Sequence, residues 1–435
     1  MSDIKVNYKL HDRCVAETDL GAIRRNLLRL KQCHIEQCDR ASGKLYEELT
    51  REQGNSVNRD GEPDPECGGK AKDVLTFAAV KANAYGHGDI EVAEAIEDVT
   101  DYFGTAGVEE ALRLRNAGIN KNILVLGSAF EEDYEAAVAE NITLNVFEYD
   151  RAKTLNDTAA RMNDVRMSSA ASGDGTGQQK KARIHISVDT GMSRLGLTPD
   201  EEGLETVRRI FELPFISVDG IFMHFAKADA ADKTAANAAL ERFVAFREMC
   251  KASGVSIPIW HCANTAAVID GIAAECGMDM VRCGIGIYGL YPSDEVDKTN
   301  AELEPALTWT SCLTYVKEIK AGTSVSYGYN FTAERDMPVG TVCCGYADGY
   351  PRRLSRCGGE VLIRGKRCRI IGNICMDQFM VDLTEVPDAA AGDKVTLIGA
   401  DGSERITADE LAKKCETISY EIVCGISSRN ARRYT

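Results

Sequence analysis

Short apolar, β-branched runs alternate with amphipathic stretches over the first two-thirds of the chain. This alternation is typical of βα units whose strands join into a parallel sheet. Eight runs are candidate strands: residues 75–80, 102–107, 123–126, 142–147, 183–188, 218–223, 257–260 and 281–287. Eight such strands predict the α/β class and a closed N-terminal (β/α)8 barrel of the TIM type.

The segments between these strands have the period of helices. A helix is expected before the first strand, over about residues 19–37, and another, with Val108, Ala111 and Leu112 on one face, should end at Gly118. Two polar stretches, residues 41–73 and 163–181, interrupt the alternation and are interpreted as surface excursions.

A second, mostly β domain is expected in the last third of the chain. Residues 293–305 are acidic and polar, and beyond them strand follows strand with Gly turns. One clear late helix should open at Thr407, since Glu410 completes the spacing of a capping box. We therefore expect a barrel over residues 12–295 and a β domain built from residues 1–11 and 296–435.

Composition narrows the class of protein. With 435 residues, 44% of them hydrophobic and 27% charged, the chain has the balance of a globular enzyme. A net charge of -16 argues against nucleic acid or anionic lipid as a partner. No apolar run of about 18 residues and no leader pattern occur, so no membrane association and a cytoplasmic location with reduced thiols are expected. The 16 cysteines and six histidines show no zinc-binding spacing, so no metal site is predicted.

Polar residues gather where the predicted barrel strands end, which is where barrel enzymes place their active sites. They are Lys81, Asp189, Arg194, His224, His261, Asn264, Thr265 and Arg282. The loops after the last two strands, where such barrels bind phosphate, supply Thr265 at a helix start and the stretch Gly284-Ile285-Gly286. A phosphorylated ligand is the natural inference, although close packing alone would explain these glycines equally well.

Nine segments, in order along the chain, resemble the motifs of the alanine racemase family. They are residues 80–88 (VKANAYGHG), 188–196 (VDTGMSRLG), 223–226 (MHFA), 261–265 (HCANT), 281–289 (VRCGIGIYG), 326–328 (SYG), 345–349 (GYADG), 375–378 (CMDQ) and 417–421 (TISYE). The resemblance implies pyridoxal 5'-phosphate as cofactor, alanine as substrate and a homodimer with shared active sites. It also implies two-base proton transfer on an external aldimine, and a supply of D-alanine for peptidoglycan.

The same resemblance implies how the cofactor is held. Lys81 would form the Schiff base, and Arg282, kept in place by His261, would face the pyridine nitrogen. An arginine does not give up its proton, so the nitrogen would stay unprotonated and the cofactor would be a weaker electron sink. The remaining cofactor contacts implied are Tyr85, His224, Thr265, Gly284, Ile285 and Tyr420.

Racemisation needs an acid/base group on each side of the reacting carbon. By resemblance these groups are Lys81 and, from the partner subunit, Tyr327. Arg194 and the main-chain N–H of Met376 would bind the substrate carboxylate. Tyr346, together with Tyr420, would narrow the entrance and favour a methyl side chain.

Two positions depart from the family pattern, and three rival functions stay open. Ser187 stands where many members carry a carbamylated lysine, which leaves open what orients Arg194, and Asn373 replaces an arginine of the entry corridor. The nearest rival is a serine or broad-specificity racemase on the same scaffold. An amino-acid decarboxylase should instead place an acidic residue at the pyridine nitrogen, and a non-catalytic cofactor carrier would leave Tyr327 and Met376 unexplained.

Overall fold

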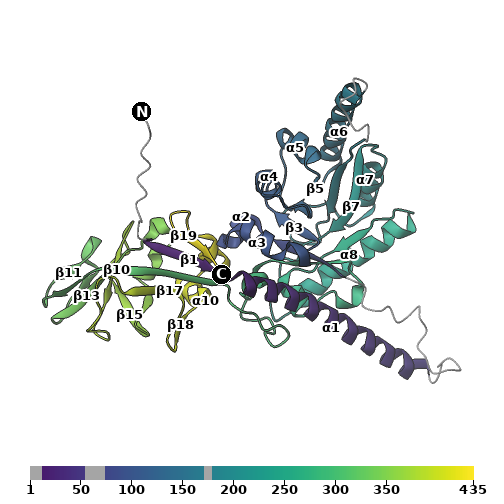
Figure 1. Ribbon diagram of the computed structural model, residues 1–435. Coiled ribbons are helices and arrows are strands. Elements are labelled where there is room, and N and C mark those ends of the chain that lie inside the picture. The colour runs from purple at the N-terminus through teal and green to yellow at the C-terminus, as the bar shows by residue number, and fades with distance from the viewer. Residues whose placement is uncertain (1–11, 54–73, 171–178) are drawn as a thin grey trace. The chain divides into compact units, whose positions relative to one another are not determined.

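The computed structural model describes residues 12–53, 74–170 and 179–435 (Figure 1). The chain forms two compact units. We call the described residues of Ala22–Ala84 and Asp89–Glu304 the barrel unit, and those of Met1–Gly21, Tyr85–Gly88 and Pro305–Thr435 the β unit. The expected place of residues 1–11 in the β domain lies outside the described residues.

The barrel unit contains the parallel eight-stranded sheet that the sequence predicts, in the order β8-β7-β6-β5-β4-β3-β2-β9. Main-chain hydrogen bonds of 2.9 Å from Asp279 N to Trp260 O and from Arg282 N to Ala263 O link the two end strands and close the barrel. The strands are β2 (Leu75–Ala79), β3 (Tyr102–Thr105), β4 (Asn122–Val125), β5 (Ile142–Val146), β6 (Ala182–Ser187), β7 (Ile216–Phe222), β8 (Ile259–His261) and β9 (Met280–Cys283). A strand is present at each of the eight predicted places.

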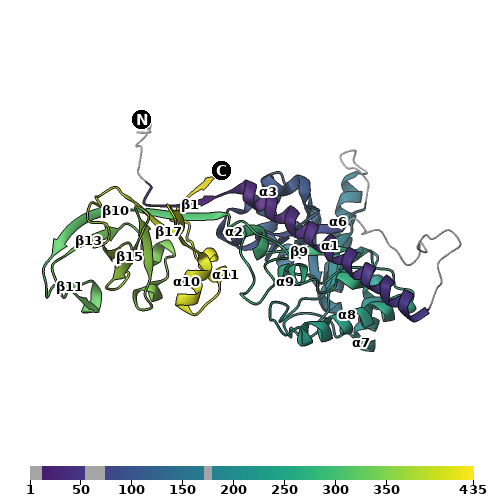
Figure 2. The same ribbon diagram turned by 90° about the horizontal axis from the view of Figure 1, so that it is seen from below.

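Helices cover the outside of these strands, as Figures 1 and 2 show. In α7, Leu204, Val207 and Ile210 recur at helical spacing and are buried, while Asp200 caps the first turn by accepting from Gly203 N at 3.0 Å. The helices are α1 (Leu20–Gln53), α2 (Lys81–Gly86), α3 (Asp89–Ile96), α4 (Val108–Asn116), α5 (Tyr134–Ala139), α6 (Tyr149–Ala170), α7 (Glu201–Phe211), α8 (Thr234–Ala252) and α9 (Thr265–Ile269).

The two polar stretches are partly helical, which the sequence pattern did not predict. Helix α1 continues to Gln53 instead of ending near residue 37, because polar residues such as Glu, Lys and Arg sustain a helix. Helix α6 runs into the second stretch, and the buried side chain of Asn163 joins the two ends of that excursion. Its Nδ2 donates to Lys180 O and its Oδ1 accepts from Lys180 N, both at 2.8 Å.

The last predicted barrel strand is shorter than expected. Strand β9 ends at Cys283, and Ile285–Tyr288 forms a 3-10 turn, η4. Gly284 has φ -114° and ψ -110°, which is outside the strand region. The Gly-x-Gly stretch therefore lies beyond the strand, and the expectation of a strand to residue 287 was wrong.

The β unit is a nine-stranded sheet in the order β18-β17-β14-β15-β16-β13-β10-β1-β19. The rings of Trp309, Tyr350 and Phe379 are fully buried in it and pack in succession, with centroids 5.6 and 5.1 Å apart. Its strands are β1 (Cys14–Thr18), β10 (Leu307–Ile319), β13 (Met337–Val342), β14 (Glu360–Ile363), β15 (Lys366–Ile371), β16 (Phe379–Asp382), β17 (Lys394–Asp401), β18 (Glu404–Ile406) and β19 (Ala431–Tyr434).

A hairpin and two helices complete the β unit. Strands β11 (Ser324–Val325) and β12 (Phe331–Thr332) pair apart from the main sheet. Helix α10 (Ala408–Cys415) begins where predicted, with the Thr407 hydroxyl accepting from Glu410 N at 3.0 Å. A second late helix, α11 (Ser419–Cys424), was not predicted.

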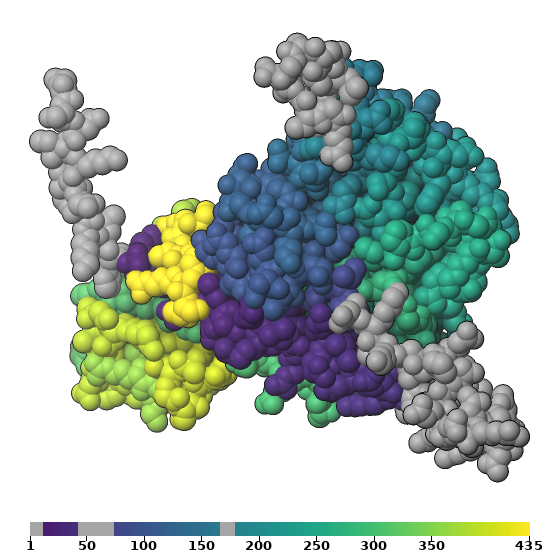
Figure 3. Space-filling view, turned by 45° about the vertical axis from the view of Figure 1, so that its right-hand side comes forward, coloured from purple at the N-terminus to yellow at the C-terminus, as the bar shows by residue number. Residues whose placement is uncertain are grey.

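The unit boundaries differ from the expected ones near the N-terminus. Strand β1 pairs with β10 and with the C-terminal strand β19, so it belongs to the β unit and not to a barrel that starts at residue 12. In Figure 3 purple residues from the start of the chain are visible at the left of the yellow C-terminal residues, within the β unit. Residues Tyr85–Gly88 also join the β unit, where Arg432 donates to Gly86 O. Both assignments depend on pairing between distant segments.

Candidate active site

Lys81 stands two residues after the end of β2, at the start of a strained turn. From Ala82 to Tyr85 the φ angles lie between 51° and 55°, so α2 is a left-handed turn. This conformation costs roughly 1–2 kcal/mol for each residue with a side chain. The carboxylate of Glu110 helps to hold it by accepting from Ala82 N at 2.8 Å. Strain of this kind, at the carboxyl end of a barrel strand, is typical of functional sites.

Arg282 is the centre of a buried polar network at the same end of the barrel. Its Nη1 donates to His261 Nδ1 at 3.0 Å, and its Nη2 contacts Met223 O (2.8 Å), Cys262 O (3.0 Å) and His224 Nδ1 (3.2 Å). Burial lowers the pKa of Arg282 to about 10, so the guanidinium stays cationic at neutral pH. No carboxylate of the described residues pairs with it, so its charge remains available to a ligand.

Three cations lie near enough to the partly buried ring of His224 for their charges to act on it. Burial lowers the pKa of His224 to about 3, and the charges of Arg282, Arg194 and Lys81 act in the same direction. These cations come from β9, from the loop after β6 and from the end of β2. The structure thus brings together side chains that are far apart in the sequence, and it keeps the imidazole between them neutral.

A cradle of hydroxyl and main-chain N–H groups lies beside this cluster. The buried Thr265 Oγ1 accepts from Gly284 N at 3.0 Å and from Gly286 N at 3.5 Å, and Ile285 is buried between the two glycines. A Cβ on Gly286 would lie 2.6 Å from Thr265 Cγ2, so only glycine allows this approach. Closely gathered N–H and hydroxyl groups suit a phosphate ester.

The loop after β6 presents Arg194 to solvent. Asp189 Oδ1 shapes the loop by accepting from Gly191 N and Ser193 N, both at 2.9 Å. Within the described part of the chain, the Arg194 guanidinium has no hydrogen bond or ion pair, and the buried Ser187 hydroxyl is also without a partner. The group that orients Arg194 is therefore not found among these residues.

In the β unit, three of the predicted site residues are exposed side chains on irregular backbone. Tyr327 is 74% exposed, Met376 53% and Tyr346 42%. Tyr327 follows Ser326, whose φ is 67°, and the turn is held by Asn373, whose Nδ2 donates to Tyr327 O at 2.6 Å. The main chain of this turn is thus fixed while the Tyr327 side chain is exposed, which leaves the phenol able to meet a ligand or partner.

The segment around Met376 packs against the turn that carries Tyr346. Tyr346 N donates to Cys375 O at 3.1 Å and Ala347 N donates to Met376 O at 3.0 Å. A Cβ on Gly345 would lie 2.2 Å from Met376 O, so this approach also requires glycine. The Met376 N–H has no acceptor among the described residues, which leaves it able to bind a ligand oxygen.

Tyr85 and Tyr420 are neighbours in the β unit. Their ring centroids are 6.0 Å apart with a 52° interplanar angle. Tyr85 is buried and burial raises its pKa, so its hydroxyl keeps its proton and is a hydrogen-bond donor. Tyr420 is partly exposed.

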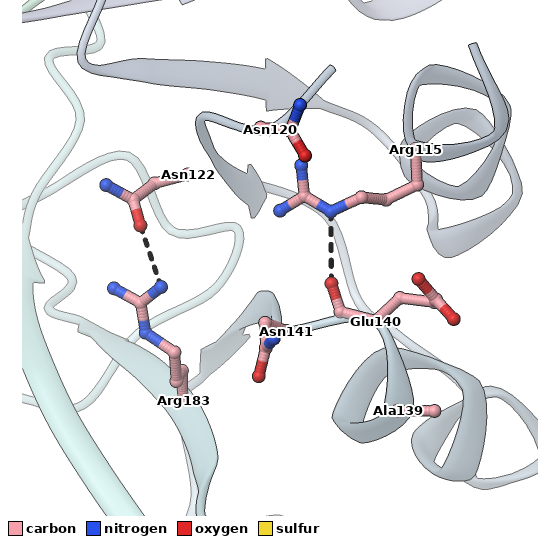
Figure 4. Close-up of a pocket in the computed structure, with 7 residues that line it drawn as sticks. All are labelled: Arg115, Asn120, Asn122, Ala139, Glu140, Asn141 and Arg183. Carbon is pink, nitrogen blue, oxygen red and sulfur yellow. Dashed lines mark hydrogen bonds between the residues drawn. The ribbon is translucent and has the colours of Figure 1, made fainter. Parts of the chain in front are cut away.

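Two other polar groupings lie outside this site. A cavity of about 390 Å³ opens at the amino ends of β4, β5 and β6, the opposite end of these strands (Figure 4). There Arg183 donates to Asn122 Oδ1 at 2.7 Å and Arg115 donates to Glu140 O at 3.1 Å. At this end of a barrel, polar networks serve stability.

The other grouping, in the β unit, is the buried set Cys14, Cys344 and Asp348, which is the only candidate metal cluster among the described residues. Asp348 already lies 3.6 Å from Arg13 and 3.5 Å from Arg429, which disfavours an added cation. The described cysteines are all unpaired thiols. No helix in the described ranges is long and apolar enough to cross a membrane.

Sequence reasoning missed two features of the site. One is the left-handed turn after Lys81, which no propensity rule indicates for the residues Ala82–Tyr85. The other is His185 on β6, whose Nδ1 lies 2.8 Å from His261 Nε2. A buried histidine inside an apolar strand, followed later by the strand glycine Gly220, was the available signal.

A barrel whose strand ends carry a lysine, an arginine without a carboxylate partner and a phosphate cradle, in a chain with a separate β unit, defines a class of pyridoxal-phosphate enzymes. The family model "Alanine racemase, N-terminal domain" matches residues 69–292, and "Alanine racemase, C-terminal domain" matches residues 306–434. The chain belongs to the alanine racemase family. It is an isomerase that uses pyridoxal 5'-phosphate and racemises alanine.

Individual relatives agree with this assignment. The chain is 41% identical to the alanine racemase of Methanococcus maripaludis over 82% of its own length and 91% of the relative's. It is similar to the solved alanine racemase of Clostridium difficile 630, with a TM-score of 0.81, 32% identity, and coverage of 98% and 97% of the two chains. The complex of that enzyme with cycloserine has a TM-score of 0.79 at 31% identity, with coverage of 98% and 96%.

Proposed function

We propose that the chain interconverts L- and D-alanine at sites shared between the two subunits of a homodimer. Lys81 of one subunit and Tyr327 of the other serve as the two bases. The observation that carries this proposal is that each of the two units holds only part of the residue set that racemisation needs. The barrel unit holds Lys81, Arg194 and Arg282 near enough for their charges to act on His224, and the β unit presents an exposed Tyr327 on a main chain held by Asn373.

The residues present fit pyridoxal 5'-phosphate. Thr265, Gly284 and Ile285, with the hydroxyls of Tyr85 and Tyr420, would bind its phosphate, and His224 would contact its ring. When bound, the cofactor withdraws electrons from the substrate Cα and so makes its proton acidic. Arg282 would meet the ring nitrogen with a guanidinium that stays protonated at neutral pH, which leaves that nitrogen unprotonated and limits side reactions.

Proton transfer is assigned to two groups on opposite faces of the substrate. The Lys81 amine removes or returns the Cα proton on one face, and the Tyr327 phenol acts on the other. Cations near a phenol favour its anionic, basic form, and Arg194 and Arg282 supply such charges in the proposed site. Each transfer of this kind typically contributes about 10²–10⁴-fold to the rate.

Substrate selection follows from the remaining residues. Arg194 and the Met376 N–H bind the carboxylate, while Tyr346 and Tyr420 limit the side chain to a methyl group. A serine or broad-specificity racemase remains the alternative, and turnover measured with alanine, serine and lysine separates the two. The enzyme would act in the cytoplasm and supply D-alanine for peptidoglycan.

The shared site is tested by mixing inactive variants. Lys81→Ala should lose both the cofactor absorbance and the formation of D-alanine from L-alanine in a D-amino-acid oxidase assay, and Tyr327→Phe should lose turnover alone. After the two variants are mixed and allowed to exchange subunits, half of the dimers carry one intact site. About one quarter of the wild-type activity should then return.

If Lys81 and Tyr327 of a single subunit formed each site, or if the chain were a monomer, the mixture would stay inactive. Each variant taken alone through the same exchange is the control. If the wild-type protein showed cofactor absorbance but did not racemise alanine, that result would favour the alternative of a non-catalytic cofactor carrier.

A further inference from the structure

The hydrogen-bond network around Arg282 includes one residue, His185, that is not among the proposed cofactor contacts. His185, on β6, is fully buried, and its Nδ1 lies 2.8 Å from His261 Nε2. The two rings meet edge to face with centroids 5.0 Å apart. Arg282, His261 and His185 therefore form a linear chain of hydrogen bonds.

The direction of every hydrogen bond in this chain follows from its first member. A guanidinium can only donate, so His261 Nδ1, at 3.0 Å from Arg282 Nη1, must be an unprotonated acceptor. A neutral His261 then carries its proton on Nε2, and this N–H donates a hydrogen bond to His185 Nδ1. His185 must in turn carry its own proton on Nε2. A cationic imidazole at either position would break the chain, because it has no acceptor nitrogen.

Burial favours the same protonation states. It lowers the pKa of His185 to about 3 and that of His261 well below the ordinary value, and the charge of Arg282 acts in the same direction on both. Both rings are therefore neutral throughout the physiological range. The chain fixes positions and passes no proton along.

The position of His185 carries a cost that its packing does not explain. Its Nε2 is buried without a hydrogen-bond partner among the described residues, and an unsatisfied buried donor destabilises the folded protein. Its ring also requires glycine on the neighbouring strand, since a Cβ on Gly220 would lie 2.6 Å from His185 Cε1. An apolar side chain would fill this space without that cost, so the acceptor on Nδ1 is the feature that distinguishes histidine here.

We propose that His185 is a positioning residue for racemisation. By accepting from His261 Nε2, it keeps His261 Nδ1 permanently available to Arg282 and so holds the guanidinium in one orientation toward the ring nitrogen of the cofactor. This inference rests on the proposed role of Arg282.

The protonation pattern can be observed directly by ¹⁵N NMR of the deuterated holoenzyme labelled at histidine, which contains only six histidines. The expected spectrum shows His185 and His261 each with a protonated Nε2 and an unprotonated Nδ1, unchanged between about pH 6 and 8. A protonated Nδ1 on His261, or titration of either ring in that range, would overturn the proposal. This readout does not depend on turnover, so it stays informative even if the assigned bases are wrong.

Two variants test the role in the reaction. His185→Asn keeps an acceptor oxygen near the position of Nδ1, whereas His185→Leu fills the space without one. His185→Leu should lower kcat about 10-fold, leave KM for alanine within about 2-fold and shift the cofactor absorption band, and His185→Asn should restore kcat to within about 3-fold of the wild type. Equal losses in the two variants, with unchanged melting temperatures, would overturn the proposal. If His185→Leu fails to fold, the activity of His185→Asn and the ¹⁵N spectrum decide.

Discussion

The side chain of Asn373 holds the main chain of Tyr327 by a hydrogen bond of 2.6 Å from Nδ2 to the carbonyl oxygen. The bond is reinforced in the opposite direction, because the hydroxyl of the adjacent Ser326 donates to Asn373 O at 2.7 Å. Asn373 is 5% exposed, whereas Tyr327 is 74% exposed. A buried amide thus fixes the position of the phenol that we assign as a base.

Asn373→Ala should therefore lower kcat for alanine racemisation by about 10- to 100-fold, because a base displaced by roughly 1 Å loses much of its rate advantage. The measurement is steady-state kinetics in both directions. Asn330→Ala, at an exposed position beside the same turn, is the matched control and should keep wild-type kinetics. Equal effects of the two changes would mean that the amide does not position Tyr327.

Stability should fall when the solution is acidified below pH ~6.5. The pKa of His34 is lowered to about 4 and those of His185 and His224 to about 3, first of all by burial. Below about pH 6.5 these histidines therefore bind protons in the unfolded chain but stay neutral in the folded chain. The stabilisation is complete above pH ~6.5 and is lost as the pH falls, by up to about 1.4 kcal/mol per pH unit for each histidine.

Urea unfolding at pH 8, 6.5 and 5.5 measures this dependence. His34→Gln should reduce the dependence of the free energy of unfolding on pH by the contribution of one histidine. A free energy of unfolding that stays constant from pH 8 to 5.5 would show that these rings take up protons as readily in the folded protein as in the unfolded chain.

Gly286→Ala should weaken cofactor binding. The added Cβ would lie 2.6 Å from Thr265 Cγ2 and 2.9 Å from Leu30 Cδ1, and relieving such overpacking costs about 1–3 kcal/mol, or roughly 5- to 150-fold in Kd. Titration of the apoenzyme with pyridoxal 5'-phosphate gives the Kd. Thr265→Ser removes Cγ2 and keeps the hydroxyl, so adding it to Gly286→Ala should recover part of the affinity. If the double variant recovered no affinity for pyridoxal 5'-phosphate, the contact with Thr265 Cγ2 would not be the cause of the weaker binding.

A glycine substitution should stabilise the protein in the left-handed turn α2, although glycine normally destabilises a right-handed helix. Ala82 is exposed and has φ 54°, so Ala82→Gly should raise the free energy of unfolding by up to about 1 kcal/mol, after allowing for the greater freedom of glycine in the unfolded chain. Ala245→Gly, at an exposed position in the right-handed α8, should lower it by about 1 kcal/mol. If urea unfolding showed that Ala82→Gly and Ala245→Gly change the free energy of unfolding in the same direction, the assignment of a left-handed turn would be contradicted.

The sequence alone was enough to predict the barrel, the separate β domain and the chemistry at the strand ends. Every barrel strand was found because its apolar run is local, and Lys81 and His224 were singled out because they follow such runs. Arg282 lies inside its run, and its role was predicted from the family resemblance. The Thr407 cap was found for the same reason, since a capping box spans only four residues.

The tertiary structure decided what depends on distant partners. Strand β1 joins the β unit because its N–H and C=O groups pair with β10 and β19, and no local pattern encodes that choice. The left-handed turn after Lys81 runs against local preference and persists because surrounding contacts hold it. The link from His185 through His261 to Arg282 joins three separate strands, so it exists only once the barrel has closed. Periodicity reports which face of an element is buried, and the folded chain alone determines which side chains meet there.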